Sequence, residues 1–434
     1  MAELLLEILS EEIPARMQAR AAADLNGLIS DGLNDAGLKF NSPHSFVTPR
    51  RLTLVIDGLS ISTPQISKER RGPRTNAPQK AIQGFLDSVG ASLENVEKRV
   101  TDKGEFYFAL VEKKGEETAK LLKEITETAF HALPWPKSMR WAEYDIRWVR
   151  PIQRIVCVFD NKVVPVMFGP IKANKYTMGH RFLTSALIEV NNFAEYKKSL
   201  EMGHVLLDPK ERRARIKADA KVLADTEGLS MVDDPSLLEE VAGLVEWPVV
   251  LLGSIDKEFM VVPPEVLKTT MRKNQKYFTL KTRNGKLAPK FIVVANKQTA
   301  DRGASIIRGN ERVLRARLAD AKFFWEQDQK ETLVSRIPQL RRIVFHSKLG
   351  TLEDKAKRVE VLALRLADSS HADSKMVQSS SRLAKADLTT GMVSEFPELQ
   401  GIMGRYYALH DGEPSEVANA IADHYSPQGP SDVC

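Results

Sequence analysis

Fifteen lysine and arginine side chains lie between Leu267 and Phe323, where only Asp301, Glu311 and Asp320 are acidic. This stretch has a formal charge of +12, twice the +6 of the whole chain. Such an excess of positive charge attracts polyanions, because each neutralised phosphate releases condensed counterions. The chemistry expected here is therefore binding to the phosphates of RNA or DNA. The residues predicted to make these contacts are Lys273, Lys276, Arg308, Arg312, Arg315 and Lys322.

A predicted helix over residues 311–326 positions three of these cations, Arg312, Arg315 and Lys322, and Asn310 is its expected N-cap, with Arg308 just ahead of it. Four apolar residues recur at helical spacing and form one stripe: Leu314, Leu318, Ala321 and Trp325. The cations lie about a quarter to a third of a turn from this stripe, so one side can pack while its neighbour faces outward. The alternative is a solvated helix face, although such faces usually mix both signs of charge. Before this helix, residues 291–295 read as a buried strand that follows a hairpin turn at Asn284-Gly285.

Residues 134–141 and 148–151 place tryptophan beside proline and arginine. Proline fixes the backbone and an indole can stack on a nucleobase, so one interpretation is contact with unpaired nucleic acid. The other is tryptophan packed beneath a proline-rich turn. The sequence favours neither.

Two isolated reactive residues are expected to be structural. His180 lies beside Arg181 in a glycine-containing turn, but no carboxylate or nucleophile is fixed next to it, as proton transfer would require. Cys157 lies in the apolar run IVCVF at 155–159, which is typical of a strand core. No catalytic residue and no metal ligand set is predicted.

Length and composition limit the number of domains and the class of protein. A chain of 434 residues has room for about three domains. Its 43% hydrophobic and 28% charged content is ordinary for a globular protein, and no apolar run approaches the about 20 residues of a membrane helix. The acidic start is unlike a secretory leader, and two cysteines fit a reducing cytoplasm.

The order of elements predicts an α+β multidomain chain. An apolar run at 4–9 precedes a helix through about residue 34 with Ser10 as its cap, and an alternating strand at 48–57 begins with two arginines. Residues 68–74 are expected to form a basic loop broken by Gly72-Pro73. The predicted division is a mixed α/β region over 1–225, a basic segment over 226–330 that faces RNA, and a helical domain over 331–434.

Several multi-residue runs, in order along the whole chain, resemble the beta subunit of bacterial tetrameric glycyl-tRNA synthetase. They are LLEI at 5–8, TPRRL at 48–52, KSMRW at 137–141, GHRF at 179–182, LVEWPV at 244–249, QKYF at 275–278, GNERVL at 309–314, ARL at 316–318, KADL at 385–388 and EFPELQGIMG at 395–404. No single run would suffice, but chance does not produce so many in one order.

This resemblance implies a division of labour. An alpha subunit binds ATP, Mg²⁺ and glycine and forms the adenylate, while the beta subunit binds tRNA(Gly) and is required for aminoacylation in an alpha2 beta2 hetero-tetramer. The chain is not expected to be catalytic alone or to hold a cofactor, and it has no phosphate-binding loop of the GxxxxGK[ST] type. The family's beta subunit is longer and ends in an anticodon-binding domain, so this sequence is expected to stop before that domain.

The last hundred residues resemble the HD-type metal phosphohydrolases. His346 and Asp387 stand at two of the positions that hold the metal in that family, but Ala386 occupies the place of the paired histidine. One histidine and one carboxylate hold a divalent metal poorly. The expectation is an HD-like domain without its metal, with two alternatives: an HD-type phosphohydrolase, or a plain helical core in which Asp387 is a cap or an ion-pair partner.

Overall fold

The computed structural model describes residues 2–102, 104–113, 115–141, 143–427 and 429–430. The chain divides into two compact units. The first comprises Met1–Arg215 and Glu239–Pro248, and the second comprises Ile216–Leu238 and Val249–Cys434. Sheets dominate the early part of the chain and helices the last part, so the α+β class is confirmed. The domain limits at residues 225 and 330 stay a prediction.

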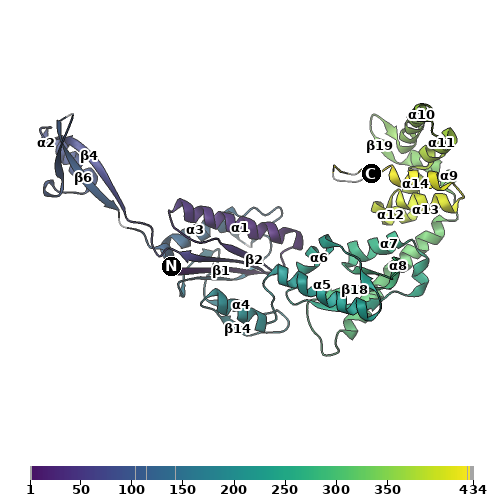
Figure 1. Ribbon diagram of the computed structural model, residues 1–434, viewed down its shortest axis with the longest axis horizontal. Helices are drawn as coiled ribbons and strands as arrows, with labels where there is room; N and C mark the ends of the chain where they lie inside the picture. Colours follow the sequence, from purple (N-terminus) through teal and green to yellow (C-terminus); the bar gives the residue numbers. More distant parts are fainter. Residues whose placement is uncertain (1, 103, 114, 142, 428, 431–434) are drawn as a thin grey trace. The chain divides into compact units, whose positions relative to one another are not determined.

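A five-stranded antiparallel sheet forms the centre of the first unit (Figure 1). Its order is β10 (Lys162–Val163), β9 (Ile152–Phe159), β1 (Ala2–Ser10), β3 (Arg51–Leu59) and β2 (His44–Val47). β1 lies in the middle and pairs with both β3 and β9. A strand covered on both faces reads as a continuous apolar run, which is why the chain begins with leucines.

Helices cover both faces of this sheet. α1 (Ala15–Asp35) and α3 (Thr118–Ala132) pack on one face, where Leu6 and Leu25 belong to one core. α4 (Phe193–Met202) packs on the opposite face, where Leu5 and Tyr196 belong to another core (Figure 1). The buried Cys157 belongs to the core of the first face, and burial raises the pKa of its thiol to about 12, so its predicted structural role is confirmed.

A smaller three-stranded sheet follows β3 in the sequence. It has the order β4 (Ile66–Arg74), β6 (Gly104–Lys113) and β5 (Glu97–Thr101), with α2 (Gln79–Val89) beside β4. The basic loop predicted at 68–74 is therefore wrong. Those residues pair with β6, and the guanidinium of Arg71 lies 3.7 Å from the ring centroid of Phe106, so the cations line a strand.

Short elements complete the first unit. They are the hairpins β7 (Met139–Trp141) with β8 (Tyr144–Trp148), β11 (Met167–Phe168) with β12 (Ile171–Lys172) and β13 (Tyr176–Met178) with β14 (Leu187–Glu189), and the single turn η1 (Leu93–Asn95). Two helices, α5 (Pro209–Thr226) and α6 (Pro235–Ala242), contribute residues to both units.

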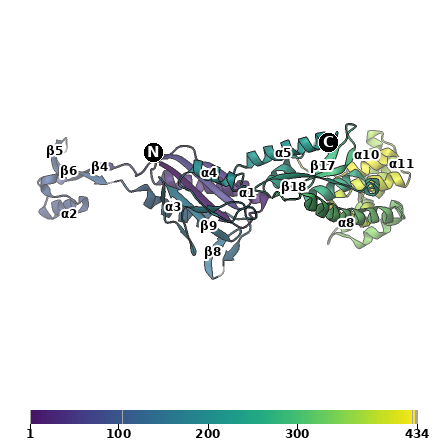
Figure 2. The ribbon, with the colours of Figure 1, turned by 90° about the horizontal axis from the view of Figure 1, so that it is seen from below.

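The second unit begins with an antiparallel sheet. Its order is β15 (Ser230–Met231), β17 (Phe278–Lys281), β18 (Leu287–Ala295) and β16 (Val249–Ser254). The predicted strand at 291–295 lies in β18, and the predicted turn joins β17 to β18 with Gly285 at φ +77°, so both predictions are confirmed. The unit also contains η2 (Lys257–Val261), α7 (Pro264–Thr269), the π-helical turn η3 (Thr270–Gln275) and the long helix α8 (Ala304–Asp328). Figure 2 shows α8 along this part of the chain.

The remaining residues form a helical region. Its elements are α9 (Leu333–Arg336), η4 (Ile337–Arg342), β19 (Val344–His346), β20 (Gly350–Thr351), α10 (Leu352–Ser370), α11 (Ser374–Leu383), η5 (Ala386–Thr389), α12 (Gly391–Glu395), η6 (Pro397–Leu399), α13 (Ile402–His410) and α14 (Ser415–Asp423). One core runs from Leu251 through Leu318 to Ile421, so α8 packs on its sheet and on these helices within the same unit. Among the described residues, no helix has the length and apolar composition to cross a bilayer.

Two predicted helix caps are wrong. Ser10 ends β1 instead of capping a helix, because it still pairs with Ile152, and α1 begins after Pro14. α8 begins at Ala304, six residues before the expected cap at Asn310. The side chain of Asp301 accepts hydrogen bonds from the backbone N–H groups of Gly303 and Ser305 (3.1 and 2.8 Å), and so satisfies the first turn.

Candidate nucleic-acid interface

The apolar stripe of α8 is confirmed. Leu314, Leu318 and Ala321 are fully buried, and Trp325 packs against the same core. Gly303, just before the helix, has φ +89°, and a Cβ there would lie 2.6 Å from Cδ2 of Leu251 on β16. A residue without a side chain is therefore required where the helix turns onto the sheet.

The four predicted cations of α8 share one side of the helix. At about 100° per residue, Arg308, Arg312, Arg315 and Lys322 fall within a sector of about 80°, adjacent to the buried stripe. The sector extends along the helix for about 21 Å, at about 1.5 Å per residue. Arg308, Arg312 and Arg315 are exposed and Lys322 is half-buried, so the predicted outward-facing basic side exists.

Asp256 and Glu258, which precede the basic stretch in the sequence, neutralise the C-terminal half of this basic side. Arg315 forms a two-pronged contact with Asp256, Nε to Oδ2 at 2.6 Å and NH2 to Oδ1 at 3.3 Å. Lys322 Nζ lies 3.1 Å from Glu258 Oε2 on η2. The hydrogen bond from Arg315 holds the pKa of Asp256 below its usual range, so this pair is charged at neutral pH. The sequence analysis did not identify these partners, because Asp256 and Glu258 lie before the basic stretch between Leu267 and Phe323.

Arg308 and Arg312 differ from Arg315 and Lys322. Within the described ranges, no carboxylate lies within ion-pair distance of either side chain. Neither arginine donates a hydrogen bond to an acid in the part of the chain that the structure describes, so both guanidinium groups are available to phosphate oxygens. Arg308 and Arg312 are thus the two of the four cations without a described acidic partner, and the phosphate contacts predicted for all four stay a prediction.

The other two predicted cations lie at the π-helical turn η3. Lys273 Nζ contacts Glu398 Oε2 at 2.8 Å. Lys276 ends the turn with φ +59°, a left-handed conformation. The next residue, Tyr277, donates a hydrogen bond from its hydroxyl to Asn310 Oδ1 at 2.5 Å, and Asn310 donates to the carbonyl of Ile306. This link fixes the end of η3 against the N-terminal half of α8, although the sequence predicted Asn310 as a cap.

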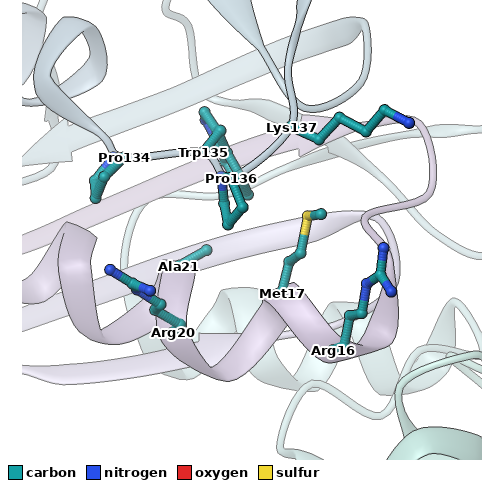
Figure 3. A pocket seen from close by; sticks show the side chains of 8 residues that line it. All are labelled: Arg16, Met17, Arg20, Ala21, Pro134, Trp135, Pro136 and Lys137. Carbon is teal, nitrogen blue, oxygen red and sulfur yellow. The ribbon is translucent and has the colours of Figure 1, made fainter. Parts of the chain in front are cut away.

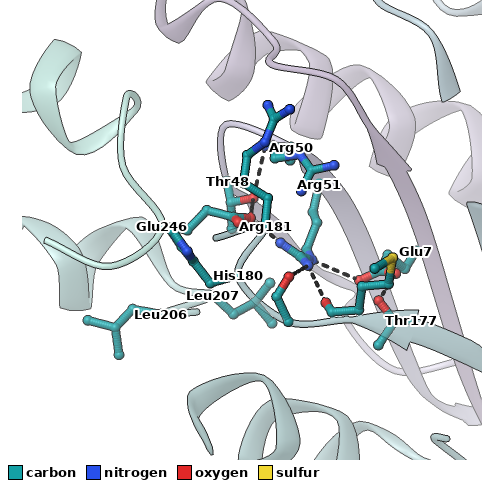
Figure 4. A network of polar contacts seen from close by, with 12 residues as sticks. Glu7, Thr48, Arg50, Arg51, Thr177, His180, Arg181, Leu206, Leu207 and Glu246 are labelled. Atoms are coloured by element: carbon teal, nitrogen blue, oxygen red, sulfur yellow. Dashed lines mark hydrogen bonds and ion pairs between the residues drawn. The ribbon is translucent and has the colours of Figure 1, made fainter. Parts of the chain in front are cut away.

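A second polar cluster is buried in the first unit and was not predicted. Arg51 is fully buried on β3, where its Nε lies 3.3 Å from Glu7 Oε2 of β1 and its NH1 pairs with Glu246 (Figure 4). Thr48 donates to the same Glu246 oxygen at 2.7 Å, and Thr177 donates to Glu7. A glutamate inside an apolar strand and an arginine at the start of another were the available signals, because buried charges must pair.

His180 belongs to the same neighbourhood. It is fully buried, and its Nδ1 accepts a hydrogen bond from the N–H of Phe182 at 3.3 Å. Arg51 also donates to the carbonyl of Gly179, the residue before His180, at 3.2 Å. These contacts fit the structural role expected for His180.

Three of the sequence runs that suggested a family meet in three dimensions: TPRRL, GHRF and LVEWPV all contribute to the cluster around Arg51. The family described as glycyl-tRNA synthetase beta subunit matches residues 4–434. The chain belongs to this family.

Curated relatives give the same assignment. The glycine–tRNA ligase beta subunit of Ruegeria sp. (strain TM1040) is 49% identical over 441 residues, and the alignment covers all of this chain and 64% of that protein. The beta subunit of Rhodospirillum centenum is 48% identical, again over all of this chain and 64% of the relative. That of Phenylobacterium zucineum is 46% identical, over 65% of its length. The chain therefore spans slightly less than two thirds of these relatives.

The structure gives different surroundings to His346 and Asp387, the two residues for which the sequence suggested HD-type metal positions. His346 is exposed on β19. Asp387 is fully buried, and its Oδ2 accepts hydrogen bonds from the N–H groups of Gly401 and Gly404 at 2.5 and 3.2 Å, at the start of α13. Asp387 therefore satisfies backbone N–H groups at the start of α13, although the N-cap residue of that helix is Gly401. No cluster of three or more His, Cys, Asp or Glu side chains suited to a metal occurs in the described part of the chain, and nothing supports the phosphohydrolase alternative.

Proposed function

We propose that this chain is the tRNA-binding part of a glycine–tRNA ligase beta subunit, which supports ATP-dependent attachment of glycine to tRNA(Gly) by an alpha subunit. The observation that carries the proposal is the family match over residues 4–434. Curated relatives aligned along the whole chain are named glycine–tRNA ligase beta subunits. The anion-binding surface is a separate, physical support.

The proposed tRNA contact is the N-terminal half of α8 with the end of η3. Arg308 and Arg312 project from a helix whose buried stripe holds it in place, and the Tyr277–Asn310 hydrogen bond fixes the residue that follows Lys276 against that half. Two guanidinium groups one helical turn apart suit the phosphates of an RNA strand, which accept paired hydrogen bonds from arginine. Lys273, Arg315 and Lys322 would take part only by exchanging Glu398, Asp256 and Glu258 for phosphate.

The remaining partners follow from the family's division of labour. ATP, Mg²⁺ and glycine are proposed to bind to the alpha subunit, in an alpha2 beta2 assembly in the cytoplasm. No residue of this chain is proposed to hold a cofactor or a metal, and membrane association is not part of the proposal.

The test is the affinity of the purified chain for tRNA(Gly), measured by fluorescence anisotropy across a salt series, with and without added alpha subunit. We expect binding that weakens linearly in log K against log salt, because phosphate contacts release counterions. We also expect tRNA(Gly) to be charged only when the alpha subunit is present. Lack of tRNA binding under both conditions, at salt below about 50 mM, would refute the proposal.

A further inference from the structure

A cavity of about 460 Å³ lies in the first unit between the N-terminal half of α1 and the loop that follows α3 (Figure 3). Met17 of α1 and Trp135 and Pro136 of the loop provide apolar walls, and Arg16, Arg20 and Lys137 provide three cations. None of the described residues that line it is acidic. The volume lies within the range of about 300–1,000 Å³ that is usual for small-molecule sites.

The aromatic wall of this cavity is fixed in place. Trp135 is half-buried and meets the ring of Trp148 edge-to-face at a centroid distance of 5.1 Å, and Trp148 is itself buried in the core. Prolines on both sides restrict the loop backbone. A ring held in this way loses little conformational entropy when a flat ligand stacks on it. Of the two interpretations of these tryptophans, Trp148 fits packing inside the protein. Trp135 packs against Trp148 and in addition lines an open cavity.

The cations of the cavity are largely uncompensated. Arg20 pairs with Asp24 at 3.5 Å. Arg16 and Lys137 are exposed, and neither has an ion-pair partner within the described part of the chain. The site therefore attracts anions, and its hydrocarbon and indole walls favour an anion that also has an apolar or aromatic body.

We propose that this cavity binds a nucleoside phosphate, with the base against Trp135 and Pro136 and the phosphate held by Arg16 and Lys137. Inorganic phosphate would leave the apolar walls unused, and an uncharged aromatic molecule would leave the cations unused. The walls provide stacking surface but little hydrogen-bonding pattern, so purines bind better than pyrimidines and the base is otherwise read weakly. The source is either a free mononucleotide or an unpaired nucleotide of RNA. The inference does not depend on the proposed function.

Equilibrium dialysis of the whole chain against four probes tests this site: AMP, adenosine, inorganic phosphate and a 5′-phosphorylated tetra-adenylate. We expect AMP to bind, and adenosine and phosphate to bind at least about tenfold more weakly, since each forfeits one of two favourable contacts. Tight binding of tetra-adenylate with weak binding of AMP identifies RNA as the source. If neither AMP nor tetra-adenylate binds, the proposal is wrong.

Variants assign the binding to this cavity. Arg16→Gln with Lys137→Gln should weaken AMP or tetra-adenylate binding about tenfold or more. Lys162→Gln with Lys172→Gln removes the same charge from exposed positions of the first unit and should leave binding unchanged. An equal loss of nucleotide affinity in both double variants would overturn the proposal. Trp135→Leu tests the stacking wall, and its melting temperature shows whether the core around Trp148 survives.

Two further measurements separate this site from other functions. tRNA(Gly) affinity of each variant is measured in parallel, so that failure of the nucleotide site with intact tRNA binding leaves the proposed function standing. Association with the alpha subunit is measured as well. If the charge variant weakens that association and leaves AMP and tetra-adenylate binding untouched, the cavity is a protein-docking groove and the nucleotide proposal is wrong.

Discussion

Arg51 and Glu246 form a fully buried ion pair although they lie 195 positions apart in the sequence. Burial alone would raise the pKa of Glu246, but the charge of Arg51 and hydrogen bonds from Thr48 and Arg51 hold it below its usual range. The pair connects β3 to the segment Glu239–Pro248. This segment belongs to the first unit, although the residues before it, Ile216–Leu238, belong to the second.

Breaking this pair should destabilise the first unit. Glu246→Gln leaves the guanidinium of Arg51 buried with Glu7 as its one acidic partner among the described residues, and we expect a loss of about 3–5 kcal/mol in the free energy of unfolding. Urea unfolding followed by circular dichroism measures it. Glu201→Gln, the same change at an exposed position of α4, is the control and should have little effect. A comparable loss of stability in both variants would mean that breaking the buried ion pair does not cause the destabilisation of Glu246→Gln.

The same pair predicts sensitivity to acid. The folded pKa of Glu246 lies below its value in the unfolded chain, so its contribution to stability is complete above about pH 4.5 and is lost as pH falls through the lowered folded value. In Glu246→Gln, stability should therefore depend less on pH below about 4.5. An unchanged acid limb of the pH–stability profile would contradict this account.

Two matched double variants separate the halves of the basic side of α8. Arg308→Gln with Arg312→Gln should weaken tRNA(Gly) binding and leave the melting temperature nearly unchanged. The slope of log K against log salt should fall by about 0.7–0.9 for each phosphate that is no longer bound. Arg315→Gln with Lys322→Gln removes the same charge. Because Arg315 and Lys322 already bind Asp256 and Glu258, their loss should weaken tRNA binding less. Equal effects on affinity would show that all four cations contact tRNA.

Asp387 should make stability fall between about pH 4 and 7. Burial raises the pKa of its carboxyl from 3.8 to about 6, so the folded chain binds this proton more tightly than the unfolded chain. The resulting stabilisation is complete below about pH 3.8 and is lost as pH rises through about 6. Asp387→Asn, which keeps an oxygen acceptor for α13, should gain up to about 3 kcal/mol relative to the natural chain across this window. A constant difference at all pH values would refute the shift.

The chain by itself should not activate glycine. The proposed function assigns adenylate formation to the alpha subunit. Glycine-dependent exchange of pyrophosphate into ATP should therefore be at background in the isolated chain and should appear when the alpha subunit is added. Exchange by the alpha-free chain, unaffected by removal of contaminating enzymes, would overturn this prediction.

The sequence determined the elements whose stability is local. The stripe of Leu314, Leu318 and Trp325 fixed which face of α8 is buried, because helical periodicity and burial act on neighbouring turns. Asn284-Gly285 fixed the hairpin between β17 and β18, since few residues adopt the backbone of such a turn. The ordered runs of residues fixed the family. None of these required knowledge of distant contacts.

Only the tertiary structure decided which charges are free. The sequence places Arg312 and Arg315 three positions apart in one basic stretch, yet Asp256 neutralises Arg315 and no described acid reaches Arg312. Likewise, Glu7 and Arg51 read as interruptions of apolar strands until folding brings Glu246 to them. Ion pairs between distant segments leave no periodicity in the sequence, because Coulomb attraction depends on distance in space, which the packing of strands and helices sets.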